Sequence, residues 1–282
     1  CRKRRYPEQP EENILYFIEK NSPVLRGWQR EIIRIVRKIN QYFYPQMYTK
    51  VMNEGWACWT HQYIMSRLYD KGLLNDGAML EYYSSHSGVV FQPEFDDQRF
   101  SGFNPYYLGL EIFKDIERIC KDPTDEDKDW FPDIAGKDHM PILKDIVANY
   151  RDESFIRQFL SPNLIRKMRL FELHDERKSD NYLVRNIHNE RGYRNIRKTL
   201  ADQYDYALIE PNIQVYNANL DSDRRLELRH YAINRRLLKT ESAQEVLKHI
   251  YRLWGFEPVI ISFDEEGNDI DEITLLESSW QK

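Results

Sequence analysis

The sequence contains no apolar run that approaches the ~18 consecutive residues of a membrane-spanning helix. It also lacks an apolar segment near its start that resembles a signal peptide. Hydrophobic residues make up 41% of the 282 positions and charged residues 31%, which is typical of a globular, soluble chain. We therefore expect a cytoplasmic protein with no membrane span. Because the chain begins at Cys1 rather than at a methionine, we also expect it to be a fragment of a longer polypeptide.

Cysteine is scarce, and the familiar catalytic motifs are absent. Cys1, Cys58 and Cys120 form no CxxC pair, so neither a disulfide scaffold nor a zinc ribbon is indicated. The sequence has no GxSxG elbow, P-loop, GxGxxG or HExxH, which disfavours nucleotide binding through the usual glycine loops. The net charge of −5 argues against general affinity for nucleic acids, and we expect no nucleic-acid partner.

The first part of the chain has the periodicity of helices. Residues 28–43 place five apolar side chains on one stripe, which predicts a helix that faces the core. That stripe consists of Ile32, Ile33, Val36, Ile39 and Phe43. Further helices are expected over residues 49–69, 105–120 and 140–159. Residues 121–138, which are acidic and hold two prolines and a glycine, predict a surface loop. We therefore expect an all-helical domain over residues 1–165.

The second part of the chain alternates between strand and helix patterns. Strands are predicted over residues 168–176, 212–218, 225–233 and 258–265, and helices over 192–209 and 241–255, with a short helical piece near 182–188. The order is strand, helix, strand, strand, helix, strand, which is that of a ferredoxin-like βαββαβ domain over residues 166–265. Residues 266–282 are acidic and are expected to form a loosely attached tail. The predicted fold class is therefore α+β.

The stretch VMNEGWACWTH at residues 51–61 is the best candidate for chemistry. On a helix, Glu54 and His61 lie two turns apart and face almost the same way, with Cys58 between them. All three are possible metal-ligand types, and His86 is the nearest further candidate. Gly55 is costly inside a helix, so it suggests that another backbone, a bulky ring or a ligand packs close. The alternative is that Glu54 and His61 are polar groups bonded to a neighbouring helix.

With these stretches in hand, the chain resembles the stage V sporulation protein R (SpoVR-like) family along essentially its whole length. The most specific stretch is Met52-Asn53-Glu54-Gly55-Trp56-Ala57 with His61. The others are Tyr6-Pro7-Glu8, Trp28-Gln29-Arg30, Tyr42-Phe43-Tyr44-Pro45-Gln46, His86-Ser87-Gly88-Val89, Asn104-Pro105-Tyr106, Leu108-Gly109 and His188-Asn189-Glu190-Arg191-Gly192-Tyr193. The resemblance implies a cytoplasmic bacterial protein linked to spore cortex formation or to stress responses. It also implies partners among kinase-linked stress proteins, and a preceding segment with two closely spaced histidines.

Three functional hypotheses follow, and the net charge disfavours the third, a nucleic-acid binder. In the first, the protein is a metal-dependent hydrolase with Glu54 and His61 as catalytic residues and with Glu54, His61 and His86 as ligands of a divalent metal, zinc above all. In the second, it is a non-catalytic assembly or regulatory partner of a serine-kinase-linked stress complex, and Glu54 and His61 are polar groups of the core. Cys58 is interpreted as filler, because the resembling family tends to carry a different small residue at this position.

Overall fold

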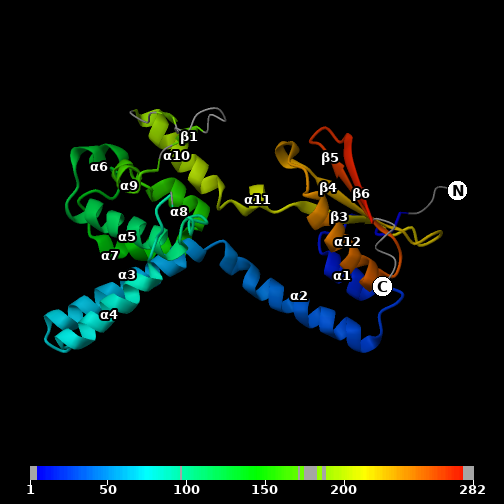
Figure 1. Cartoon of the computed structure of the whole chain (residues 1–282), viewed down its shortest axis with the longest axis horizontal. Coiled ribbons are helices and arrows are strands. Elements are labelled where there is room, and N and C mark those ends of the chain that lie inside the picture. Colours follow the sequence, from blue (N-terminus) through cyan, green and yellow to red (C-terminus); the bar gives the residue numbers. More distant parts are fainter. Residues whose placement is uncertain (1–4, 96, 171, 175–182, 186–188, 276–282) are drawn as a thin grey trace. The chain divides into compact units, whose positions relative to one another are not determined.

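The computed structural model describes residues 5–95, 97–170, 172–174, 183–185 and 189–275 (Figure 1). These residues form two compact units, one made of residues 1–44 and 207–282 and the other of residues 45–206. The division therefore differs from the boundary expected near residue 165. The difference arises because the N-terminal helices share a hydrophobic core with the C-terminal sheet, a long-range contact that local periodicity does not contain.

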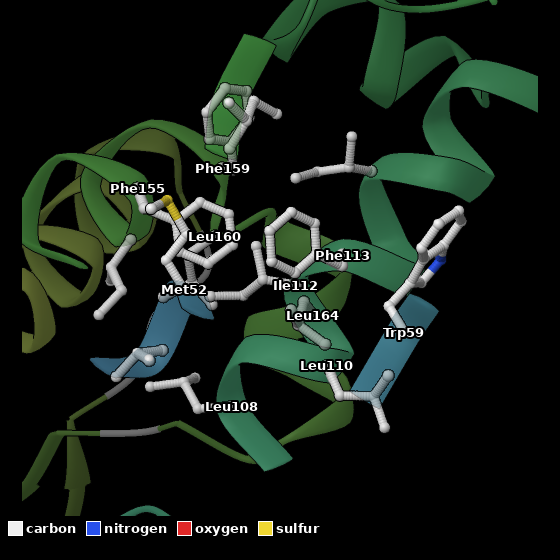
Figure 2. Close-up of a cluster of buried hydrophobic side chains, with 14 of the residues drawn as sticks. Met52, Trp59, Leu108, Leu110, Ile112, Phe113, Phe155, Phe159, Leu160 and Leu164 are labelled. Atoms are coloured by element: carbon white, nitrogen blue, oxygen red, sulfur yellow. The ribbon is translucent and has the colours of Figure 1, made fainter. Parts of the chain in front are cut away.

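The unit of residues 45–206 is mainly helical. Its helices are α3 (Lys50–Asp70), α4 (Asp76–Val89), α5 (Pro105–Lys121), α6 (Asp125–Trp130), α7 (His139–Asn149), α8 (Asp152–Phe159), α9 (Pro162–Lys167) and α10 (Glu190–Asp202). A two-stranded antiparallel sheet of β1 (Glu172–His174) and β2 (Leu183–Arg185) completes it. Large apolar side chains fill its core, among them Met52 and Trp59 from α3, Phe113 from α5 and Phe155 from α8 (Figure 2). The helix α5 is the centre of this core, because its residues from Leu108 to Phe113 are all buried.

The structure confirms the helices expected over residues 49–69 and 105–120 and corrects three neighbouring predictions. Residues 121–138 are not all loop, because Thr124 and Asp127 form a capping box that starts α6. The helix predicted over 140–159 is broken at Tyr150 into α7 and α8. Residues 183–185, within the predicted helical piece, form strand β2, and the rest of that piece lies outside the described residues.

The other unit packs side chains from three helices and a sheet into one core that contains Trp254, which is fully buried. Its elements are α1 (Ile14–Asn21), most of α2 (Gly27–Met47), α11 (Tyr206–Ile209) apart from its first residue, β3 (Asn212–Asn217), β4 (Leu226–Tyr231), a 3-10 turn (Ile233–Arg235), α12 (Thr240–Trp254), β5 (Pro258–Phe263) and β6 (Asp269–Thr274). The strand order is β3-β4-β5-β6, and only the β4–β5 pair, which α12 connects, is parallel. The helix α12 packs against β5 and β6.

The α+β class is thus confirmed, but the ferredoxin-like topology is not. The strand at residues 172–174 pairs with β2 in the other unit and does not enter the four-stranded sheet. The edge position beside β5 is filled instead by β6, from the segment expected to be a loose acidic tail. The prediction failed because β6 is mostly acidic and its two isoleucines, Ile270 and Ile273, do not follow the alternation of a strand; only Ile273 is buried.

The helix α2 forms as expected, but its apolar stripe does not face the core. Of the five stripe residues only Ile33 is buried. The other four, Ile32, Val36, Ile39 and Phe43, are exposed. What α2 places against α1 is a different face, since Arg30 donates to the carbonyl oxygens of Glu19 and Ser22. Periodicity alone predicts an amphipathic helix, but it does not predict whether the apolar face is buried in the core or left exposed.

Candidate functional site

The helix that carries Glu54 and His61 is held against α5 by two glycines. A Cβ atom at Gly55 would lie 2.3 Å from the backbone carbon of Gly109, and one at Gly109 would lie 2.1 Å from the carbonyl oxygen of Val51. Neither position therefore tolerates a side chain while the two backbones stay in place. The expectation that Gly55 marks a close approach is confirmed, and the approaching group is the backbone of α5.

The N-terminal end of α3 is fixed by a carboxylate from α8. Asp152 is 1% exposed and accepts hydrogen bonds from the backbone amides of Val51 at 2.9 Å and Met52 at 2.8 Å. These are two of the amides that a helix start leaves without an intrahelical partner. Burial raises the pKa of Asp152 to about 6, against the opposing effect of the backbone hydrogen bonds from α3. The position of α3 in this unit is therefore set by Asp152 and by the crossing of α3 and α5 at Gly55 and Gly109.

A pocket of about 520 Å³ lies where α3, α4 and α5 meet. The helix α3 contributes Cys58 and His61, α4 contributes Tyr82 and His86, and α5 contributes Tyr106. Its remaining lining residues are Ala57, Met65, Ala78, Glu81, Ser85 and Val89. The pocket therefore combines small and apolar side chains with two imidazoles, two phenols and a thiol, a mixture typical of ligand sites.

Tyr82 lies between the two histidines. Its ring centroid is 4.8 Å from that of His61, in an edge contact, and 5.2 Å from that of His86, in a stacked one. His61 is exposed, whereas Tyr82 is buried. Burial lowers the pKa of His86, with smaller contributions in the same direction from Lys114 and His61, so His86 is a neutral imidazole at pH 7. The same desolvation raises the pKa of Tyr82 to about 12.

Two polar atoms of this group have no hydrogen-bond partner among the described residues. They are Nε2 of His86 and the hydroxyl oxygen of Tyr82, both buried. Buried polar atoms in folded proteins nearly always have a partner, which is either protein, water or ligand. Both residues line the pocket, so a water or a ligand in the pocket would be within their reach.

Glu54 lies beside the pocket and is already engaged. It accepts a hydrogen bond from the hydroxyl of Tyr106, and this bond raises the pKa of that tyrosine. Cys58 is buried and lines the pocket, and burial, followed by the charge of Glu54, raises the pKa of its thiol. A thiol with a raised pKa is neutral at pH 7 and a poor nucleophile, which agrees with its interpretation as filler.

The predicted ligands do not by themselves form a metal site. Over the ranges that the structure describes, no three side chains of the His, Cys, Asp and Glu types converge as a metal centre would require. A catalytic zinc takes three protein ligands and a water. Glu54, His61 and His86 lie around one pocket but do not fit a complete ligand set, so no catalytic step is assigned to a metal here.

Sequence reasoning missed Tyr82 and Tyr106, which connect the predicted residues. The place of Tyr106 was predictable, because Asn104 and Pro105 mark the start of α5 and put Tyr106 in its first turn. Tyr82 carried a weaker signal, because it lies one turn before His86 on α4. The contact between Tyr82 of α4 and His61 of α3 depends on how the two helices pack, which the local sequence does not show.

The chain belongs to the SpoVR family. A model described as SpoVR like protein matches residues 1–209, and one described as SpoVR-like C-terminal domain matches residues 211–265. The resemblance read from the NEGWA stretch is thereby confirmed.

A curated relative is "Uncharacterized protein YcgB" of Escherichia coli (strain K12), which is 51% identical over 274 residues. That alignment covers 97% of this chain and 53% of the relative, so the chain spans about half the relative's length. No solved structure matches the chain. Among the helices that the structure describes, none has the length and apolarity needed to cross a membrane.

Proposed function

We propose that the pocket between α3, α4 and α5 is a hydrolytic site, amidase-like in its chemistry, with Glu54 and His61 as its catalytic residues. The observation that carries the proposal is the pair of unpartnered buried atoms, Nε2 of His86 and the hydroxyl of Tyr82, on residues that line one pocket with His61. A neutral imidazole in such a place can accept a hydrogen bond from a water or a substrate. Glu54 and His61 act either as ligands of a metal or as the general base and the orienting group for the attacking water.

The proposal includes a divalent metal, zinc above all, for which Glu54, His61 and His86 would supply only part of the ligand set. Further ligands would have to come from outside the pocket residues described here. Two closely spaced histidines in a preceding segment, implied by the family resemblance, are suitable ligand types.

Elemental analysis tests this proposal on protein of the relative's full length, with Glu54→Gln and His61→Ala as variants and Ser85→Ala as the control. Ser85 lines the same pocket but has no ligand role here. We expect stoichiometric divalent metal in the wild type and control, and its loss in both variants. Metal-free wild type together with variants that lose only stability would contradict the proposal.

A second function is favoured by one contact, the interaction of Glu54 with the hydroxyl of Tyr106. In this alternative Glu54 joins α3 to α5 and has no catalytic role. The protein is then a non-catalytic assembly or regulatory partner of a serine-kinase-linked complex, acting in the cytoplasm in sporulation or stress responses. A pull-down from stressed cells that recovers no kinase-associated protein would count against it.

A further inference from the structure

The helix α2 carries an unpartnered apolar seam with coiled-coil spacing. Its members are Trp28, Ile32, Ile35, Ile39 and Tyr42, which are separated by steps of four, three, four and three residues. Each of them is between 49% and 71% exposed. Steps of four and three are the a and d spacing of a heptad, which keeps one apolar line along a helix. Large aromatic and β-branched side chains are seldom left exposed in such a line without a partner.

The seam lies on the side of α2 that faces away from its contacts with α1. The contact face consists of Arg30, Ile33 and Arg37, which reach α1 or the core beside it. At roughly 100° per residue, these three positions lie about opposite to the line through Ile32, Ile35 and Ile39. The helix is therefore anchored in its own unit by one face and can present the other.

The charges beside the seam are complementary to a second copy of the same helix. With Ile32 and Ile39 at a and Ile35 at d, the two flanking g positions are held by Glu31 and Lys38, both exposed. When two such helices run antiparallel, with Ile32 facing Ile35 and Trp28 facing Ile39 of the second copy, Glu31 of each copy lies beside Lys38 of the other. Flanking charges set the orientation of helix pairs, and here they favour this register.

A shift by one heptad gives a less favourable pair. Ile32 would then face Tyr42 of the second copy, and Lys38 would lie beside Lys38, so that two like charges meet at the centre. A parallel pair would put Glu31 beside Val36 and form no ion pair between the copies, so that Glu31 would keep only its ion pair with Arg34 of the same helix. The charge pattern thus selects one arrangement with two-fold symmetry, in which each surface is its own complement.

We propose that the α2 seam is a homodimer interface in which two copies of this chain pair antiparallel through Trp28, Ile32, Ile35 and Ile39, with reciprocal Glu31–Lys38 ion pairs. The interface is separate from the α3–α4–α5 pocket and does not rest on the function proposed for it.

Sedimentation equilibrium of this chain tests the proposal. Wild type is expected to be a dimer that dissociates on dilution, and Ile35→Asp is expected to be a monomer at every concentration used. The matched control is Asn40→Asp, an exposed position of the same helix outside the seam, which should dimerise like wild type. Circular dichroism of each variant checks that the fold is retained.

Charge reversal tests the register. Glu31→Lys alone and Lys38→Glu alone each replace two ion pairs with two like-charge contacts and should weaken the dimer about tenfold. The double variant exchanges the two signs and should restore the affinity to near that of wild type. A monomeric wild type, which would leave the seam to another part of the full-length protein, overturns the proposal. So does a dimer that is insensitive to Ile35→Asp or to the single charge reversals.

Discussion

At the scale of single residues, the least expected group is the carboxyl of Asp152. Its two oxygens bond to the first amides of α3, yet its burial among apolar groups makes ionisation costly. Nothing near Asp152 in the sequence predicts this, because its partners lie a hundred positions away. Glu54 and His61, by contrast, could be chosen from their spacing on one helix, and the pocket brings His61 beside the predicted His86.

Asp152 should make the protein less stable as the pH rises. Its folded pKa of about 6 is higher than the unfolded value, so the proton is bound more tightly in the folded state. The associated stability is complete below about pH 4 and is lost as the pH rises through 6, in total roughly 3 kcal/mol. Urea unfolding from pH 4 to 8 measures this loss as the free energy of unfolding of wild type minus that of Asp152→Asn. This quantity should fall as the pH rises. If this quantity rises with pH instead, the amides of α3 lower the pKa of Asp152 and the prediction is wrong.

At the scale of elements, the crossing of α3 and α5 controls the site. Gly55 could be identified as unusual because it lies inside a predicted helix. That it contacts Gly109 could not be predicted, since the pairing of distant helices leaves no local pattern. The predicted bounds of α3 and α5 were nearly right because their caps and stop signals are local, such as Asn104 before Pro105. What the helices pack against depended on side chains from other segments, Phe155 and Leu164 among them (Figure 2).

Replacing either glycine of the crossing should force α3 and α5 apart. We expect Gly109→Ala to lower the free energy of unfolding by about 3 kcal/mol, because its methyl group would overlap the backbone of Val51. Gly88→Ala is the control, since a Cβ atom there meets nothing within 4 Å in a helix of the same unit. That variant should be neutral or slightly stabilising. Thermal unfolding of the two proteins gives the comparison, and equal melting temperatures would refute the crossing.

At the scale of the whole molecule, the chain is organised around two hydrophobic cores. One contains buried residues from Val51 to Ala201, and the other combines Phe17 and Ile18 with the sheet and α12. The predicted order of strands and helices was largely right along the chain, but their grouping was not. The order of elements along the chain does not show which of them share a core, and here the first helices pack with the last strands and α12.

Separate cores predict separate responses to mutation. Ile273 of β6 is 3% exposed in the sheet core, and Ile273→Ala should destabilise that unit by roughly 2–4 kcal/mol. Hydrogen exchange followed by mass spectrometry should then show faster exchange in β3 to β6 and α12, with α5 unchanged. Equal acceleration in α5 would mean that the two units unfold as one.

The sequence by itself determined the family, the α+β class, the helices α3 and α5 of the pocket and the candidate residues Glu54, His61 and His86, because caps, periodicity and a specific motif are local properties. Tertiary structure alone decided that Gly55 meets Gly109, that Tyr82 separates two histidines and that β6 completes the sheet. It also decided that the apolar stripe of α2 is left outside the core. These outcomes depend on which segments distant in sequence pack together, and that is decided by the contacts of the whole folded chain.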